Sequence, residues 1–250
     1  MTTAELAPQV AAGVASGAAQ RADPRLVLAL DVPARADAES MVERLGDSVL
    51  FYKIGLQLLA GGGMEMARDL KRRGRNVFLD WKLHDIGATV EKATAAIVAS
   101  GACDLLTVHA EPQVMAAAVR GRAGAVGAKI IGVTVLTSLT EEDLAEIGYQ
   151  RSIAALVELR VRQAIDAGID GIVTSPREAA IARRIGGPNF LVITPGVRPG
   201  WARADDQARA ATPAEALAAG ASHIVVGRPI TAANDPRGAA FRIAGEMAAG

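Results

Sequence analysis

Eight short apolar segments recur along the chain, and each is followed by a segment rich in Ala, Leu, Glu and Arg. The apolar segments are about five residues long and most end in a polar residue or a Gly/Pro turn, which is typical of buried β-strands. They span Leu26–Asp31, Leu50–Ile54, Asn76–Asp80, Leu105–His109, Lys129–Val135, Gly171–Thr174, Phe190–Thr194 and His223–Val226. The segments between them, such as Ala88–Ala99 and Ile153–Ala167, carry apolar residues three and four apart, as amphipathic helices do.

This alternation favours parallel pairing, because parallel strands need a long crossover connection. Several strand cores are apolar at consecutive positions, as strands covered on both faces are. A chain of 250 residues, 50% of them hydrophobic, is long enough for one large core. A closed (β/α)8 TIM barrel matches this length and strand count best, and a doubly wound open sheet is the alternative. We predict one barrel domain over 23–250, preceded by an extension, 1–22, that is partly helical or disordered.

Composition excludes several classes of protein. Lys and Arg total 27 and Asp and Glu total 27, whereas nucleic-acid binders carry a basic excess. The single cysteine, Cys103, excludes an intramolecular disulfide framework and a Cys-rich zinc site, and we expect it to be a buried filler. No uninterrupted apolar stretch approaches the roughly 18 residues of a membrane span, and the N-terminus lacks the early positive charge of a signal peptide. We therefore expect a cytoplasmic protein without nucleic-acid or membrane partners.

A barrel of this class carries its function at the carboxyl ends of its strands. Polar residues there include Asp31, Lys53 and the group Asp80-x-Lys82-x-x-Asp85. Because residues two apart in an extended segment point the same way, Asp80 and Lys82 are expected to share a side. Opposite charges about 4 Å apart attract by about 4 kcal/mol at an effective dielectric near 20, which keeps Lys82 protonated as a general acid. On spacing alone an ordinary ion-pair network at the barrel rim is the better interpretation. The position after the third strand, together with a second site, shifts the interpretation toward catalysis.

The second site follows the last two strands. Gly227 and Arg228 come directly after the eighth strand and before a helix start. Glycine lets backbone N–H groups approach an anion, a helix N-terminus favours negative charge, and arginine binds phosphate in a bidentate fork. Phosphate sites after strands seven and eight are frequent in this barrel class, and a plain turn with a surface arginine is the alternative. The charged loop Arg198–Ala211 is expected to close over the barrel mouth as a lid.

Together these residues resemble a known family. The segment Phe78-Leu79-Asp80-Trp81-Lys82-Leu83-His84-Asp85-Ile86 resembles the signature of the orotidine 5′-phosphate decarboxylase family. Five more segments fall in the family's order: Leu28–Asp31, Tyr52–Gly55, Val133–Ser138, Thr194–Arg198 and Val226–Ile230. The resemblance covers nearly the whole chain after residue 25. Trp81 stands where a smaller apolar residue is usual, and Gly87-Ala88 stands where Pro-Asn is usual.

The resemblance implies an enzyme that decarboxylates orotidine 5′-phosphate to uridine 5′-phosphate and CO2 in pyrimidine biosynthesis, without a cofactor and without a metal. Lys82 would be the general acid that protonates the pyrimidine carbon left by CO2. Asp80 would press on the substrate carboxylate and hold Lys82, and Lys53 would belong to the same charge row. Asp85 would reach into the active site of a partner subunit, so that a homodimer shares its two sites.

Contacts to the rest of the nucleotide follow from the same resemblance. The implied substrate-binding residues are Asp31, Lys53, Asp80, Ile86, Thr89, Thr137, Arg198, Gln207, Gly227 and Arg228. The first two would bind ribose hydroxyls, and Ile86 and Thr89 would cross from the partner subunit, with Thr89 toward the ribose. Thr137 would contact the pyrimidine. The last four residues would bind the phosphate, with Gln207 also spanning toward the base as the lid closes.

Two competing functions differ in class. A metal-dependent sugar-phosphate decarboxylase or aldolase of the same barrel superfamily resembles the chain at Asp80-x-Lys82-x-x-Asp85. It would carry an acidic metal ligand on the second strand, where this sequence has Lys53, and a lysine repels a divalent cation. A non-catalytic barrel that binds a phosphate ligand explains Gly227 and Arg228 but gives no reason for the row of Asp and Lys residues.

Overall fold

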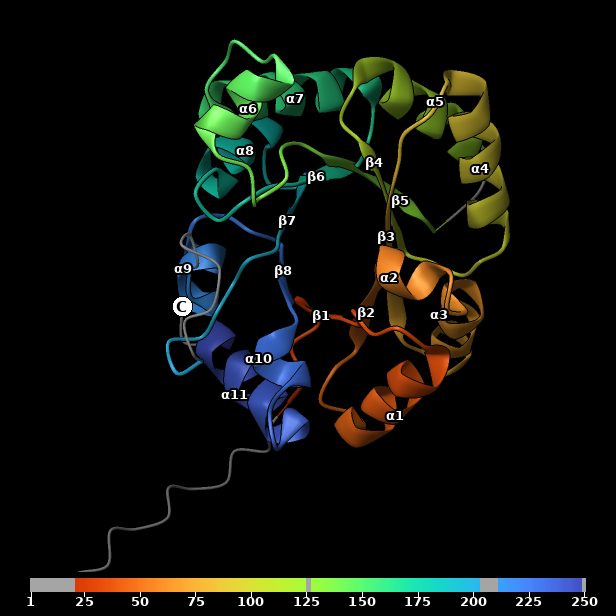
Figure 1. The fold of residues 1–250 in the computed structure, drawn as a ribbon, viewed down its shortest axis with the longest axis vertical. Helices are drawn as coiled ribbons and strands as arrows, with labels where there is room; N and C mark the ends of the chain where they lie inside the picture. The colour runs from red at the N-terminus through yellow and green to blue at the C-terminus, as the bar shows by residue number, and fades with distance from the viewer. Residues whose placement is uncertain (1–20, 125–126, 203–210, 249–250) are drawn as a thin grey trace, which may run out of the picture.

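Eight parallel strands close into a barrel in chain order in the computed structural model, which describes residues 21–124, 127–202 and 211–248 (Figure 1). The strands are β1 (Leu26–Ala29), β2 (Phe51–Ile54), β3 (Asn76–Leu83), β4 (Leu105–His109), β5 (Lys129–Val133), β6 (Gly171–Val173), β7 (Leu191–Thr194) and β8 (His223–Val226). β1 pairs with β8 and so closes the sheet. The predicted (β/α)8 barrel is confirmed, and the open-sheet alternative is excluded.

Helices surround the barrel and connect its strands (Figure 1). They are α1 (Arg35–Leu45), α2 (Leu56–Leu59), α3 (Gly63–Arg72), α4 (Gly87–Ala99), α5 (Pro112–Arg122), α6 (Glu141–Ile147), α7 (Ile153–Ala167), α8 (Ala179–Gly186), α9 (Pro213–Ala218), α10 (Arg228–Thr231) and α11 (Pro236–Ala248). α7 coincides with its predicted range. It begins at a Ser152 cap, whose hydroxyl accepts from the backbone N–H of Ala155, and it ends at Gly168 with a φ of 75°.

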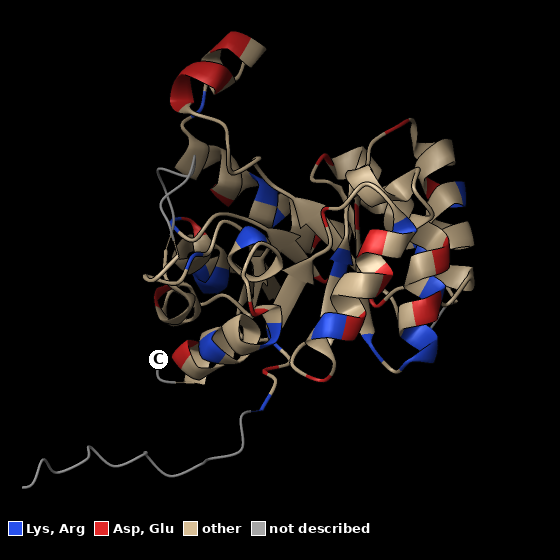
Figure 2. Ribbon diagram, turned by 60° about the horizontal axis from the view of Figure 1, so that its bottom comes forward, with Lys and Arg blue, Asp and Glu red and all other residues tan. Residues whose placement is uncertain are grey.

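Charged residues of both signs are interspersed along the outer helices (Figure 2). None of the helices in the described part of the chain has the length and apolar character needed to cross a bilayer. Residues 1–20 of the predicted N-terminal extension lie outside the described residues. Cys103 is buried as expected, and burial raises the pKa of its thiol to about 12, so it remains a protonated packing residue.

Strand alternation builds two separate cores. The inward-facing residues form a cluster inside the barrel, made of Val27, Ala29, Phe51, Phe78, Leu105, Ile131, Ile193 and Val225. The residues between them along the strands, such as Leu28, Tyr52 and Leu79, join the larger cluster under the helices. Since the inner cluster fills the barrel, a cavity is expected at the carboxyl ends of the strands, between the last inward residues and the loops that follow.

The last part of β3 departs from regular pairing with β4. Leu79 pairs with Leu106 and Leu83 pairs with Val108, so the stretch of β3 between the two pairs is longer than the facing stretch of β4. Lys82 lies in this bulge with a φ of 48°, as the one non-glycine residue of the described chain with positive φ. A left-handed conformation costs a non-glycine residue about 1–2 kcal/mol. Two expectations were therefore wrong. The strand β3 continues past Asp80 to Leu83. The position of Lys82 is set by the bulge, and not by the regular alternation of side chains along an extended strand.

Candidate active site

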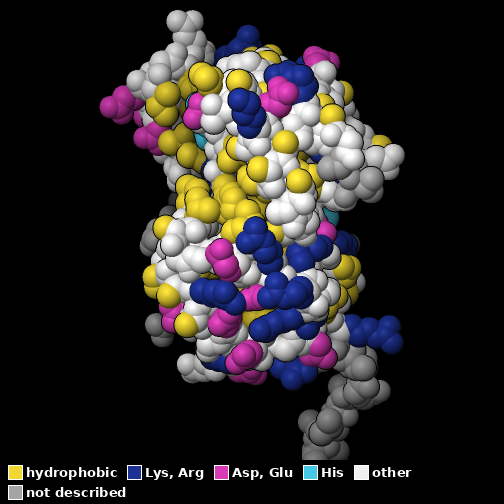
Figure 3. All heavy atoms as spheres, turned by 90° about the vertical axis from the view of Figure 1, so that its right-hand side faces the viewer, with side chains coloured by type: hydrophobic (Ala, Val, Ile, Leu, Met, Phe, Trp, Pro, Cys, Tyr) yellow, Lys and Arg dark blue, Asp and Glu magenta, His cyan; other side chains and the backbone are white. Residues whose placement is uncertain are grey.

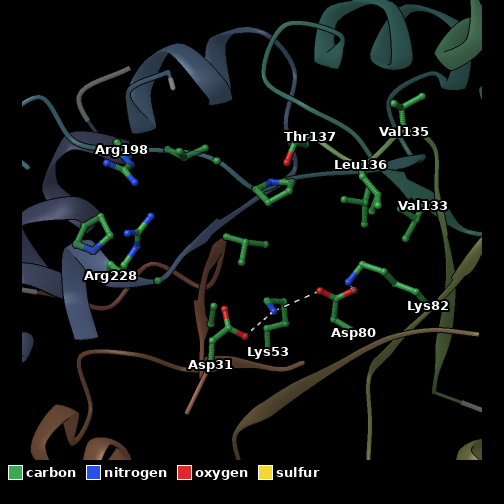
Figure 4. Close-up of a pocket in the computed structure, with 18 residues that line it drawn as sticks. Asp31, Lys53, Asp80, Lys82, Val133, Val135, Leu136, Thr137, Arg198 and Arg228 are labelled. Atoms are coloured by element: carbon green, nitrogen blue, oxygen red, sulfur yellow. Dashed lines mark hydrogen bonds and ion pairs between the residues drawn. The ribbon is translucent and has the colours of Figure 1, made fainter. Parts of the chain in front are cut away.

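A cavity of about 380 Å³ opens at the carboxyl ends of the strands (Figure 4). Its size falls within the range of small-molecule pockets, roughly 300–1,000 Å³. The lining residues are Ala29, Asp31, Lys53, Asp80, Lys82, Val133, Val135, Leu136, Thr137, Val173, Pro195, Gly196, Val197, Arg198, Val225, Gly227, Arg228 and Pro229. Charged groups lie at both ends of the cavity, with apolar side chains between them (Figure 4).

One end is a row of alternating carboxylate and ammonium groups from the first three strands. The Nζ atom of Lys53 lies 3.2 Å from Oδ1 of Asp31 and 3.3 Å from Oδ2 of Asp80. The Nζ atom of Lys82 lies 2.9 Å from Oδ1 of Asp80. Each carboxylate oxygen of Asp80 therefore faces its own ammonium group. The predicted proximity of these residues holds, although the bulge in β3, and not strand alternation, positions Lys82.

Asp80 is the most constrained member of this row. It is buried, and burial by itself raises the pKa of a carboxyl group. The charges of Lys53 and Lys82, and the hydrogen bonds from both ammonium groups, outweigh this effect and hold the pKa of Asp80 below its usual value. Asp80 is therefore an ionised carboxylate near neutral pH, at the wall of the cavity.

The opposite end of the cavity carries two arginines. Arg198 follows β7 and Arg228 follows β8, and these two strands pair directly with each other (Figure 4). α10 is a single turn of four residues, so the guanidinium groups, more than a helix dipole, make this end positive. The backbone N–H of Arg198 donates to the carbonyl of Ala211 at 2.8 Å, which joins the two ends of the predicted lid. Gln207 and the rest of 203–210 lie outside the described residues.

Three predicted site residues lie outside this cavity. Asp85 and Ile86 lie between the end of β3 and the start of α4, and Thr89 lies in the first turn of α4. All three are exposed, and the residue Ile86 is 72% exposed. The Oδ1 atom of Asp85 accepts from the backbone N–H of Ile86 at 2.6 Å. The structure thus brings together Asp31, Lys53, Asp80, Lys82, Thr137, Arg198, Gly227 and Arg228, and leaves these three on the surface.

Sequence reasoning missed the apolar wall of the cavity and one buried hydroxyl. The wall includes Val133, Val173 and Val225, which are inward positions that strand alternation alone identifies once the barrel phase is known. The hydroxyl belongs to Thr107 on β4, which is fully buried and contacts Asp80. The available signal was a polar residue at an inward position of an otherwise apolar strand.

Neighbouring groups have structural roles. His84 and His109 stack with ring centroids 4.6 Å apart, and both approach Oε2 of Glu111, at 3.7 and 3.9 Å. Across the described ranges, no group of three or more His, Cys, Asp or Glu residues is arranged to hold a metal. The unusual Trp81 packs against the core under the helices and does not line the cavity, so its size leaves the cavity unchanged.

Comparison with known proteins gives one consistent result. The model of the "Orotidine 5′-phosphate decarboxylase / HUMPS family" matches residues 24–243. An orotidine 5′-phosphate decarboxylase of Caulobacter sp. (strain K31) is 65% identical over 227 residues, covering 91% of this chain and 98% of that protein. One of Rhodopseudomonas palustris (strain BisB5) is 53% identical over 232 residues, with the same coverage.

Solved structures agree with the sequence relatives. The crystal structure of orotidine 5′-phosphate decarboxylase from Lactobacillus acidophilus superposes with a TM-score of 0.79 at 34% identity, covering 90% of this chain and 99% of that one. An uncharacterized conserved protein from Geobacillus kaustophilus superposes with a TM-score of 0.76 at 33% identity, covering 89% and 99%. The chain belongs to the orotidine 5′-phosphate decarboxylase / HUMPS family.

Proposed function

We propose that the protein decarboxylates orotidine 5′-phosphate to uridine 5′-phosphate and CO2 in pyrimidine biosynthesis, in the cytoplasm. The observation that carries this proposal is the row Asp31–Lys53–Asp80–Lys82 facing an arginine pair across one cavity. The decarboxylase names of relatives up to 65% identical support the same reaction. A nucleotide fits this arrangement because it carries an anionic phosphate at one end and the reacting carboxylate at the other.

Binding energy comes mainly from the phosphate end. Arg198 and Arg228 form charge-assisted hydrogen bonds with the phosphate, and Gly227 leaves room for a close backbone approach. The ribose hydroxyls lie against Asp31 and Lys53. The pyrimidine occupies the apolar middle of the cavity next to Thr137. In the proposal, Gln207 adds a further phosphate contact when the loop that contains it closes.

The chemistry takes place at Asp80 and Lys82. The substrate carboxylate lies beside the ionised Asp80, and this repulsion is relieved as CO2 departs. The carbon–carbon bond breaks, its electron pair stays on the ring carbon, and the ammonium group of Lys82 donates a proton to that carbon. Charges fixed in advance stabilise the developing carbanion without reorganisation. Phosphate binding at the far end supplies energy for this strained arrangement.

The proposal includes a homodimer with shared active sites. Figure 3 shows apolar side chains gathered across the middle of the face that carries α3, α4 and α5 in Figure 1. Three large apolar residues near these helices, Leu56 and Leu59 of α2 and Ile86 directly before α4, are exposed. We place a second copy of the chain against this face, so that Asp85, Ile86 and Thr89 complete the partner's cavity. Asp85 then adds a further carboxylate beside Lys82.

The chain needs no metal in this proposal. A divalent cation held between Asp31 and Asp80 would have to lie where the Nζ atom of Lys53 lies, within 3.3 Å of both carboxylates. A lysine ammonium and a divalent cation repel each other at this distance. This donor set therefore disfavours the metal-dependent alternative.

The test is to mix the purified protein with orotidine 5′-phosphate in the presence of excess chelator and to follow the loss of substrate absorbance. We expect turnover at the same rate with and without chelator. Tight nucleotide binding without CO2 release would favour the non-catalytic barrel. Loss of turnover on prolonged chelation would favour the metal-dependent enzyme.

A further inference from the structure

One buried hydroxyl contacts both residues at the centre of the proposed chemistry. Thr107 lies on β4 and is fully buried, outside the cavity lining. Its Oγ1 atom lies 2.9 Å from the backbone nitrogen of Lys82 and 3.1 Å from Oδ1 of Asp80. The same Oδ1 atom receives the hydrogen bond from Nζ of Lys82 at 2.9 Å. Thr107 thus links the backbone of Lys82 to the carboxylate of Asp80, which in turn binds the side chain of Lys82.

The bulge in β3 explains why a hydroxyl is needed at this point. Lys82 has left-handed geometry inside an irregular stretch of the ladder, and its backbone N–H is directed to the threonine oxygen. A buried N–H without a partner is costly. The single hydroxyl proton has two acceptors in range, Oδ1 of Asp80 at 3.1 Å and the carbonyl of Leu79 at 3.5 Å. The shorter contact and the negative charge favour Asp80.

We propose that Thr107 is a positioning residue, which sets the carboxylate of Asp80 and the backbone of Lys82 relative to each other. Without the hydroxyl, the carboxylate of Asp80 keeps only its contacts with the ammonium groups of Lys53 and Lys82, and the left-handed backbone at residue 82 loses the acceptor of its N–H. The ammonium group of Lys82 then spends less time aimed at the reacting carbon. This role rests on the proposed decarboxylation, because it acts only through Asp80 and Lys82.

Such a role predicts that kcat changes while KM does not. The phosphate contacts at Arg198 and Arg228 lie at the far end of the cavity and do not involve β4. Loss of the Thr107 hydroxyl therefore lowers kcat and leaves KM nearly unchanged, as expected when an interaction supports the transition state alone. A general loss of folding would also lower the apparent kcat at unchanged KM, so the pattern counts only when kcat is expressed per folded site.

The test compares three variants with the wild type under identical conditions. Thr107→Val keeps the shape and removes the hydroxyl, and we expect kcat to fall roughly 10- to 100-fold with KM within about twofold. Thr107→Ser keeps the hydroxyl, and we expect kcat within about threefold of the wild type. Thr174→Val is the matched control, since Thr174 is buried and its hydroxyl has no hydrogen-bond partner within the described residues.

Folded sites are counted by titration with uridine 5′-phosphate, and kcat is expressed per folded site. If Thr107→Val does not fold, Thr107→Ala takes its place with the same serine variant as its rescue. Wild-type kcat per site in the variant that lacks the hydroxyl would overturn the positioning role, and so would equal losses in the valine and serine variants. If the wild type itself releases no CO2, the proposed function fails, and the role of Thr107 fails with it.

Discussion

The two ends of the barrel use polar residues in opposite ways. At the amino end, Asp104, Asp170 and Ser222 each stand directly before a strand and accept from a backbone N–H of the preceding strand, at Val77, Ile130 and Val192. Asp104 is also neutralised by Lys71, and Asp170 by Arg122. At the carboxyl end, the charges of Asp31, Lys53, Asp80 and Lys82 bind one another and face an open cavity.

This difference separates the residues that stabilise the fold from those that line the cavity. Carboxylates at the amino end accept hydrogen bonds from backbone N–H groups, and these hydrogen bonds stabilise the register of the strands. At the carboxyl end, the charges of Asp31, Lys53, Asp80 and Lys82 are paired with neighbours that also line the cavity. Substitutions at the carboxyl end should therefore change turnover more than stability, and substitutions at the amino end should do the reverse.

The largest effect is expected for Lys82→Ala. Loss of the proposed proton donor should lower kcat by about 10⁴-fold, near the upper range for a general acid. The anion end is untouched, so uridine 5′-phosphate should still bind, as measured by calorimetry. A variant that is folded, binds the product and turns over near the wild-type rate would remove Lys82 from the proposed role.

The next prediction compares the arginine end of the cavity with the end that carries Asp80 and Lys82. Arg228→Ala should lower kcat/KM roughly 100-fold, since a charge-assisted phosphate contact is lost. The loss should appear mainly in KM, in contrast to the Lys82 variant. Arg237→Ala is the matched control, because Arg237 lies on the surface, where it pairs with the exposed Asp47 and lies over the ring of Phe241. Equal losses in both arginine variants would argue against a phosphate site.

Much of this organisation was predictable because barrel geometry follows from local patterns. Alternating apolar runs predict the strands, and charges at their ends predict the polar row. The bulge in β3 was not predictable, since it depends on pairing between Leu83 and Val108, and such register is set by a partner strand distant in sequence. The contact of Thr107 with Lys82 was missed for the same reason, because it joins two strands through that irregular pairing.

A smaller effect tests whether the carboxyl end is completed by a partner. Lys82→Ala and Asp85→Asn are each expected to be inactive as homodimers. After mixing and subunit exchange, activity should return to about one quarter of the wild-type value, because half of the dimers are mixed and each contains one intact site. Turnover is measured before and after exchange. No recovery, although mixed dimers are detected by mass spectrometry, would contradict shared sites.

At the amino end, Asp104→Ala should change stability and leave kcat unchanged. The variant leaves the buried N–H of Val77 without its acceptor and Lys71 without its ion pair, at a cost of about 1–3 kcal/mol. Denaturant unfolding measures the free energy, and the decarboxylation assay measures kcat. A fall in kcat per folded site would show that the two ends are not independent.

The smallest effect at neutral pH is expected for His223→Phe, again at the amino end. His223 is largely buried against Phe51, with ring centroids 5.7 Å apart, and burial lowers the pKa of its imidazole from 6.5 to about 4, with a further lowering from the charge of Lys129. The unfolded chain therefore binds a proton between pH 6.5 and 4 that the folded chain does not bind. The free energy of unfolding of the wild type should fall by about 2–3 kcal/mol over this window relative to the variant, which keeps the ring contact and cannot titrate.

Denaturant unfolding at pH 7 and pH 4.5 measures the difference, and kcat at pH 7 should be equal in both proteins. Parallel pH dependences would mean that His223 is protonated in the folded barrel, where the carboxylate of Asp23 favours its charged form.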